Sequence, residues 1–142
     1  LICLGNSLTC LFGRDNRLAA LQQFHQILRP GGVLLIDERN YQKILDNREA
    51  ALSGILHSAG KYLYTGTHKV RSKFVGINDE SIIIEYQRRK SGKRAYYIVY
   101  PLRRRELLAL LKEASFLQIE QFNDYEPGVN PDADFYQYVC VK

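Results

Sequence analysis

Residues 29–41 decide the fold, and they read RPGGVLLIDERNY. Residues 29–32 form a helix-stopping signal, because proline cannot continue a helix and paired glycines allow left-handed or extended backbone. Residues 33–36 are a continuous apolar run, which is typical of a strand buried inside a sheet. The stretch therefore predicts the end of a helix, then a buried strand, and then a polar loop at the carboxyl end of that strand.

A similar strand opens the chain, because residues 1–4, LICL, are apolar and lead directly into Gly5-Asn6-Ser7. We expect this strand to be buried and covered on both faces. Residues 8–14 are predicted to form a loop, and Asp15 is the predicted N-cap of a helix. The helix is indicated by apolar residues at three- and four-residue spacing: Leu18, Leu21, Phe24, Ile27 and Leu28. Two strands separated by a helix predict a right-handed parallel crossover.

The loops that follow the two strands should meet at the carboxyl edge of the sheet, where ligands bind in open α/β folds. Gly5 allows a ligand to approach the backbone, Asn6 offers a donor and an acceptor, and Arg39 offers a planar fork suited to a carboxylate. A plainer interpretation makes Gly5 and Asn6 turn residues. It likewise makes Arg39 a surface charge paired with Asp37 or Glu38. The convergence of all three residues at one edge favours a binding site.

The rest of the chain predicts a helix over 41–56 and a change of hydrophobic period to two from residue 61 to residue 101. That change predicts an antiparallel meander inserted in the α/β fold, with turns between its strands. The predicted strands are 62–64, 70–75, 81–89 and 94–100. A closing helix is predicted over 103–114. Two strands able to pair antiparallel are predicted over 117–122 and 135–141.

The net charge of +5 comes mostly from two basic clusters. Residues 88–94 surround Ser91-Gly92, which is typical of a hairpin tip, and residues 103–105 precede the closing helix. A solvated face is the plainer interpretation of both clusters. The sequence has no RNP or G-x-x-G signature, so we expect no nucleic-acid partner.

Cysteine and histidine spacing argues against a metal or disulfide site. Cys3, Cys10 and Cys140 are an odd set without a C-x-x-C pair, and the three histidines are scattered. No apolar window approaches the roughly 20 residues needed to cross a bilayer. We therefore expect a cytoplasmic protein with no metal and no membrane partner.

These features resemble the second half of class I S-adenosylmethionine-dependent methyltransferases. More specifically, ICLGNS at residues 2–7 with residues 29–41 is similar to the glycine and sarcosine N-methyltransferases, in which ICLGNS and a GG-hydrophobic-ID-x-RNY segment occur at similar separation. The resemblance is specific to about residue 45 and looser beyond it. It implies the C-terminal portion of an α/β, Rossmann-like class I methyltransferase fold with an inserted antiparallel β-meander. The implied parts are 1–60 as core, 61–101 as an inserted sheet and substrate lid, and 102–142 as closing helix and strands.

The resemblance also implies roles for individual residues. S-adenosyl-L-methionine would lie against Leu4, with Gly5 and Asn6 between it and the substrate. Arg39 would bind the carboxylate of a small amino acid. Cys10 is the fourth predicted cofactor contact, after Leu4, Gly5 and Asn6. The family often has a histidine at this position. The sheet tyrosines that would close the substrate pocket are Tyr64, Tyr86 and Tyr100. The predicted catalytic set is Asn6, Arg39, Tyr86 and Tyr100.

The implied reaction is methyl transfer from S-adenosyl-L-methionine to the amine of glycine, sarcosine or a related small molecule. Such a methyl group is already activated, so orientation, worth roughly 7 to 11 kcal/mol, matters more than an acid–base pair. Pocket volume, which the sequence does not give, would select the amine. One alternative is a methyltransferase of the same fold that acts on RNA or another anion through the two basic clusters. Another is a non-catalytic module.

This sequence contains no glycine-rich cofactor loop, because Gly31-Gly32 belongs to a turn at the opposite edge of the sheet. We therefore expect these residues to hold most of the acceptor site and only part of the cofactor site. The apolar opening run likewise favours the second half of a larger domain. A homo-oligomer is compatible with this sequence.

Overall fold

The structure is a computed structural model that describes residues 1–56, 63–65 and 68–142. The chain divides into two compact units, the first comprising residues 1–43 and 102–142 and the second comprising residues 44–101. The predicted inserted sheet falls within the second unit, which also takes in the helical residues after 43. No helix in the described part of the chain is long and apolar enough to cross a membrane.

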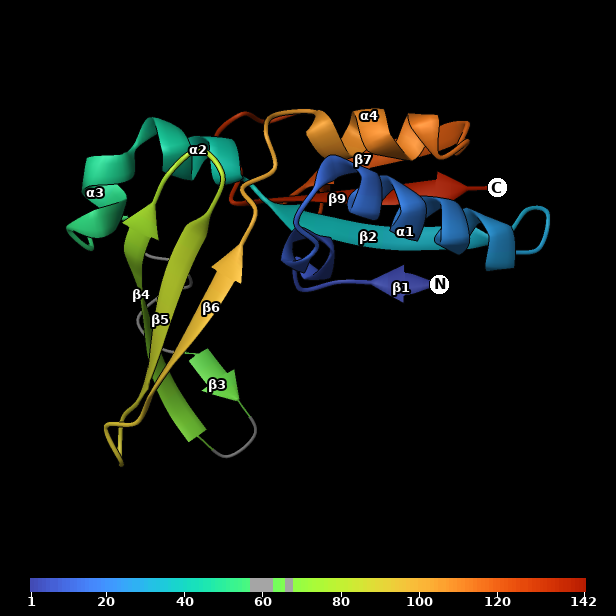
Figure 1. Cartoon of the computed structure of the whole chain (residues 1–142). Coiled ribbons are helices and arrows are strands. Elements are labelled where there is room, and N and C mark those ends of the chain that lie inside the picture. Colours follow the sequence, from blue (N-terminus) through green and yellow to red (C-terminus); the bar gives the residue numbers. More distant parts are fainter. Residues whose placement is uncertain (57–62, 66–67) are drawn as a thin grey trace. The chain divides into compact units, whose positions relative to one another are not determined.

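The first unit contains a five-stranded mixed sheet in the order β1-β2-β9-β7-β8 (Figure 1). Its strands are β1 (Ile2–Cys3), β2 (Val33–Arg39), β7 (Gln118–Asn123), β8 (Glu126–Pro127) and β9 (Phe135–Val141). β1 and β2 are parallel, whereas β9 runs antiparallel to both β2 and β7. The parallel pair and the closing antiparallel strands confirm the predicted topology.

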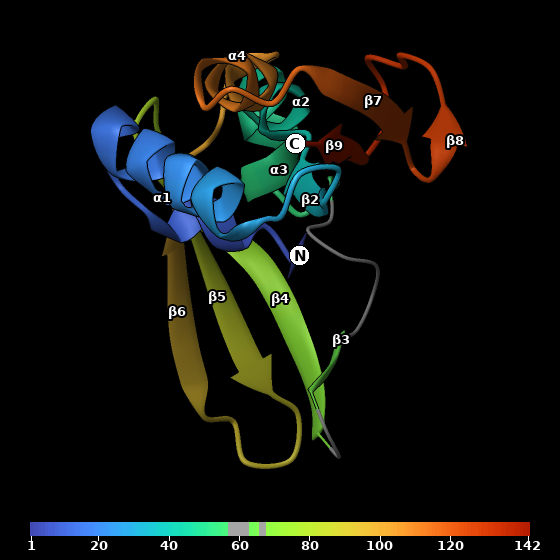
Figure 2. The same ribbon diagram turned by 90° about the vertical axis from the view of Figure 1, so that its right-hand side faces the viewer.

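Helices α1 (Arg14–Ile27) and α4 (Glu106–Glu113) lie side by side against one face of this sheet (Figure 2). The side chains of Leu34 and Ile36 on β2 are fully buried and alternate with less buried neighbours. Burying one such side chain stabilises the fold by roughly 1.5 to 3 kcal/mol. The buried Arg17 of α1 also donates to the Glu106 carboxylate of α4 at 3.1 Å. A partly buried ion pair therefore joins the two helices.

Several predicted boundaries in the first unit were wrong. Gly13, with a φ of 85°, is the N-cap of α1, so Asp15 lies in the first turn, where its charge still favours the helix dipole. The predicted loop contains a 3-10 helix, η1 (Ser7–Cys10). Helix α4 starts at Glu106 because Arg105 adopts left-handed backbone.

The opening apolar run, predicted to be a strand buried on both faces, is short and is not buried by the described residues. Only Ile2 and Cys3 form a strand, and Ile2 is 71% exposed. β1 lies at the edge of the sheet, and among the described residues helices cover one face of the sheet (Figure 2). Leu35 points away from the face on which Leu34 and Ile36 are buried, because successive side chains of a strand alternate between faces. Ile2 pairs with Leu35, so its side chain also lies on the face that these helices do not cover.

The second unit contains an antiparallel sheet in the order β3-β4-β5-β6, which confirms the predicted meander. The strands are β3 (Leu63–Thr65), β4 (His68–Ile77), β5 (Ile82–Arg88) and β6 (Arg94–Val99). The predicted helix over 41–56 is instead divided into α2 (Tyr41–Asp46) and α3 (Arg48–Leu52). Asn47 separates them with a non-helical φ of −122°, because asparagine favours caps over helix interiors.

Candidate active site

The polar loops that the sequence places at one edge of the sheet do lie there. Ile2 pairs with Leu35 and Cys3 pairs with Ile36 in parallel register. The residues after β1 therefore adjoin the carboxyl end of β2. Leu4, Gly5, Asn6 and Arg39 all belong to this edge of the first unit.

The turn after β1 has left-handed backbone at two successive residues. Gly5 has a φ of 76° and Asn6 a φ of 60°. Glycine adopts this region at no steric cost, and asparagine tolerates it better than most residues. The Asp37 carboxylate accepts the backbone N–H of Gly5 at 3.1 Å and that of Asn6 at 2.9 Å. One side chain on β2 thus fixes the left-handed turn after β1.

The Asn6 side chain completes the link between the two loops. Its Oδ1 atom accepts the backbone N–H of Arg39. Its backbone carbonyl accepts both the N–H of Thr9, at 3.1 Å, and the Thr9 hydroxyl, at 2.6 Å. Within the described residues its Nδ2 group has no partner, so two donors at the sheet edge are available to a ligand. The GNS and DERNY segments are therefore one hydrogen-bonded unit.

Arg39 is half-buried at the end of β2, and its guanidinium lies 4.6 Å from the centre of the Phe135 ring. The two residues are cross-strand neighbours on β2 and β9. A ring under a guanidinium attracts the cation and limits its rotamers. Phe135 therefore orients the fork that the sequence assigned to a carboxylate. No local pattern identified Phe135, because its position depends on pairing between strands about a hundred residues apart.

Glu38 points to the other side of β2 and is only 3% exposed. The Tyr138 hydroxyl donates to its Oε1 at 2.8 Å, and its buried Oε2 has no hydrogen-bond partner among the described residues. Burial raises the pKa of Glu38 to about 8, and the nearby carboxylates of Glu106 and Asp37 add to that rise. Glu38 is therefore mostly protonated at neutral pH. The plainer interpretation, in which Arg39 is a surface charge paired with Asp37 or Glu38, does not hold for Glu38, which is buried on the other side of β2.

Asn40 and Tyr41 have structural roles that the sequence did not assign. Asn40 Nδ2 lies within hydrogen-bond distance of the Tyr136 hydroxyl, at 3.0 Å, and of two backbone carbonyls in the loop before β9. Its Oδ1 accepts the Lys43 N–H at 3.1 Å and so caps α2. The Tyr41 hydroxyl lies 3.5 Å from Thr9 Oγ1, and burial raises the pKa of Tyr41 to about 12. Both side chains hold the site's loops in place.

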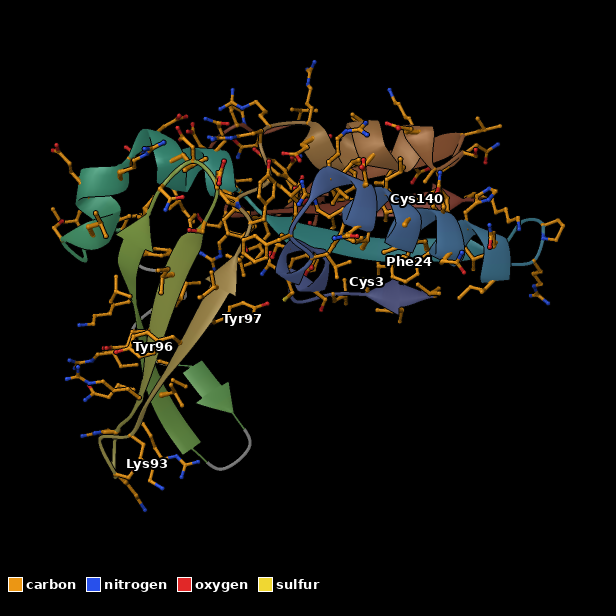
Figure 3. The ribbon with its side chains drawn as sticks, in the orientation of Figure 1. Cys3, Phe24, Lys93, Tyr96, Tyr97 and Cys140 are labelled. Atoms are coloured by element: carbon orange, nitrogen blue, oxygen red, sulfur yellow. The ribbon has the colours of Figure 1, made fainter. Side chains whose placement is uncertain are left out.

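The predicted sheet tyrosines belong to the second unit. The rings of Tyr86 and Tyr97 lie 6.5 Å apart on one face of the sheet, and Tyr96 points to the opposite face (Figure 3). Tyr100 is half-buried just beyond β6. Tyr64 lies in β3, and its side chain is outside the described residues. Their contribution to a pocket with Arg39 stays a prediction.

Cys10 ends the 3-10 helix and is exposed. It lies four residues after Asn6, in the same unit as the other predicted cofactor contacts. Its contact with the cofactor stays a prediction.

The chain is similar to curated N-methyltransferases over its whole length. It is 33% identical over 144 residues to the glycine/sarcosine/dimethylglycine N-methyltransferase of Actinopolyspora halophila, covering 100% of the chain and 24% of that protein. It is 32% identical over 143 residues to the glycine/sarcosine N-methyltransferase of Aphanothece halophytica, covering 99% of the chain and 50% of that protein. The chain spans half or less of the length of these relatives and matches their C-terminal part. No protein-family model matches it.

Solved methyltransferase structures share the fold. A S-adenosylmethionine-dependent methyltransferase from Clostridium acetobutylicum superposes with a TM-score of 0.65 at 17% identity, covering 99% of this chain and 56% of that one. An amino pentose methyltransferase from Micromonospora echinaspora, with S-adenosylmethionine bound, gives the same score at 13% identity, with the same coverage. The chain therefore has the C-terminal portion of the class I methyltransferase fold, as the sequence predicted.

Proposed function

We propose, from the relationship of this chain to the C-terminal part of glycine/sarcosine N-methyltransferases, that it forms the acceptor-binding portion of an S-adenosylmethionine-dependent N-methyltransferase. The proposed acceptor is the amine of a small amino acid such as glycine or sarcosine. One observation carries the proposal: Asp37, Asn6 and Arg39 form a single network at the carboxyl edge of the sheet. The proposal includes a cytoplasmic location and is compatible with a homo-oligomer.

The sheet edge fits part of a cofactor site. Among the described residues, no heavy atom lies within 4 Å of the position that a Cβ on Gly5 would occupy, so the backbone is open to close approach. Leu4 is exposed beside it and offers an apolar surface. When bound, S-adenosylmethionine supplies a methyl group that is already activated on a sulfonium. We assign Leu4, Gly5, Asn6 and Cys10 to its contacts.

Arg39 binds the acceptor's carboxylate in this proposal. Its guanidinium is always charged and can form two parallel hydrogen bonds with a carboxylate. Phe135 limits its rotamers, so less side-chain entropy is lost on binding. Glu38 is largely neutral and lies on the other side of β2, so its charge does not compete with the substrate for Arg39.

Asn6 orients the acceptor's amine. Its Oδ1 already accepts the Arg39 N–H, and a carbonyl oxygen has a second lone pair that can accept an N–H of the substrate. That bond leaves the amine's own lone pair available for the methyl carbon. The left-handed turn and the Asp37 carboxylate fix the position of Asn6, so orientation is established before the substrate binds.

The tyrosine-bearing sheet is the proposed lid. Tyr64, Tyr86 and Tyr100 would wall the acceptor and exclude water, with hydroxyls that assist Asn6. The face shared by Tyr86 and Tyr97 supports this role, because paired rings form a stiff apolar wall with polar ends.

The test is methyl transfer by the full-length protein to glycine, sarcosine, dimethylglycine, methylamine and bulk RNA. We expect turnover of at least one amino acid and a much higher KM for methylamine, which lacks the carboxylate that Arg39 would bind. Equal use of methylamine and glycine would refute the carboxylate site. Turnover of RNA alone would move the protein to a different substrate class.

A further inference from the structure

The second unit carries a basic hollow that the proposed acceptor chemistry does not use. It has a volume of about 220 Å³ and is lined by Arg71, Gln87, Arg88, Arg89 and Gly92. Arg71 and Gln87 are cross-strand neighbours on β4 and β5. The other residues belong to the end of β5 and the turn into β6. Figure 3 shows nitrogen-tipped side chains gathered around Lys93 in this turn.

The sequence around the hollow has an excess of positive charge. Residues 86–100 contain Arg88, Arg89, Lys90, Lys93 and Arg94 but no aspartate or glutamate. The preceding acidic residue, Glu85, pairs with Lys73, two residues along β5 from the pair of Gln87 with Arg71. Its carboxylate accepts the Tyr96 hydroxyl at 3.2 Å and is bridged by Lys73 at 3.3 Å and Arg94 at 3.4 Å.

Glu85 is already paired with the cations of Lys73 and Arg94, so it adds little negative charge to the hollow. Like charges placed close together on a sheet destabilise it, and the repulsion is relieved when an anion binds between them. Three arginines from two strands and a turn, Arg71, Arg88 and Arg89, therefore line a hollow that favours an anion.

The chemistry of the lining selects the anion. Guanidinium forks match oxyanions in paired hydrogen bonds, and Gln87 adds neutral donors. Gly92, with a φ of 66°, has no heavy atom of the described residues within 4 Å of its absent Cβ, so the turn stays open there. We infer that the basic hollow binds a phosphate group. It is built from the second unit alone, without Asn6 or Arg39.

A phosphate group can come from a small phosphorylated molecule or from the backbone of a nucleic acid. Both share the same recognition chemistry, and the two sources differ in how affinity depends on length and salt. A discrete phosphate binds with one-to-one saturation. A nucleic-acid backbone binds more tightly as it lengthens and loses affinity steeply with added salt.

The first test is calorimetric titration of the full-length protein with inorganic phosphate at low salt. The variant Arg88→Gln with Arg89→Gln should weaken binding at least about tenfold, because charge-assisted hydrogen bonds are lost. The matched control is Arg29→Gln with Lys112→Gln, which removes two exposed charges from the first unit and should leave the affinity unchanged. Methyl transfer to the small amine should be retained in both, which separates this site from the acceptor site.

The second test repeats the titration with single-stranded RNA of increasing length. Displacement of phosphate by RNA, lost in the Arg88/Arg89 variant, would assign the phosphate to a nucleic acid. Phosphate binding without such displacement would assign it to a small molecule. Absence of saturable phosphate binding, or equal weakening in the control, would overturn the inference.

Discussion

Glu38 in β2 and Glu85 in β5 are strand carboxylates with nearly equal burial and different neighbours. They are 3% and 4% exposed, respectively. Each accepts a hydrogen bond from a tyrosine hydroxyl, Glu38 from Tyr138 at 2.8 Å and Glu85 from Tyr96 at 3.2 Å. Their ionisation nevertheless differs, because the pKa of Glu38 is raised and that of Glu85 is lowered.

The depth of each carboxylate in its unit and the neighbouring charges both contribute to the difference. Burial raises the pKa of Glu38, and the carboxylates around it add to that effect. Burial also tends to raise the pKa of Glu85, but hydrogen bonds from Lys73 and Tyr96 and the charge of Arg94 outweigh it, so that pKa is lowered. Glu38 of the first unit is thus a protonated acid next to Arg39 in the sequence. Glu85 of the second unit is an ionised carboxylate paired with Lys73 and Arg94.

Glu38→Gln should give the largest effect. The native state holds a proton that the unfolded chain releases between pH 4.5 and about 8, so stability falls as pH rises through that window. The full difference is on the order of 5 kcal/mol. Glutamine resembles the protonated acid, so the variant's advantage should grow from near zero at pH 4.5 to a plateau above pH 8, measured by urea unfolding of the full-length protein.

The matched control is Glu120→Gln, an exposed carboxylate on β7 of the same sheet. It should show no such window. A stability difference between wild type and Glu38→Gln that is constant with pH would contradict the assignment of a neutral Glu38.

Asp37→Asn should have the next largest effect, because Asp37 is the adjacent carboxylate and bonds to backbone amides rather than to a hydroxyl. An amide nitrogen cannot accept a hydrogen bond, so one N–H of the turn loses its partner at a cost of roughly 1 to 3 kcal/mol. Displacement of Asn6 should lower kcat for glycine more than it raises KM. Steady-state kinetics of Asp37→Asn, compared with those of the exposed control Asp132→Asn, measure this effect. Wild-type kinetics in Asp37→Asn would contradict the role of Asp37 in fixing the turn at Gly5 and Asn6.

Glu85→Gln should have the smallest effect and the opposite pH dependence. Its lowered pKa means that Glu85 contributes stability above the unfolded pKa of 4.5, and this contribution is lost as pH falls through the lower folded value. The variant should therefore be less stable than wild type at pH 7 and equal to it in acid. Thermal unfolding tests this, with Glu80→Gln as the exposed control. A stability difference between wild type and Glu85→Gln that grows as pH falls would contradict an ionised Glu85 paired with Lys73 and Arg94.

The sequence predicted the sheet because its signals are local. Two apolar runs, a helix-stopping RPGG and a change of period to two identified the parallel pair and the meander. Local signals failed where one residue changes the backbone: Gly13 capped α1 and Asn47 divided the predicted helix. These changes depend on cap geometry, which hydrophobic spacing does not record.

The candidate site was predictable in part. The strand ends indicated Gly5, Asn6 and Arg39, and the structure brings them into one network. A further signal was present, because the period of two that buries Leu34 and Ile36 also buries Glu38. Phe135 beneath Arg39 was not predictable, since it depends on the register of a distant strand.

The most direct test of the account is the glycine and methylamine kinetics of Arg39→Gln in the full-length protein. If Arg39 binds the acceptor's carboxylate, the KM for glycine should rise about tenfold to a hundredfold, while methylamine turnover stays unchanged. The exposed control Arg29→Gln should alter neither. Equal losses for the two amines, or an unchanged KM for glycine, would contradict the account.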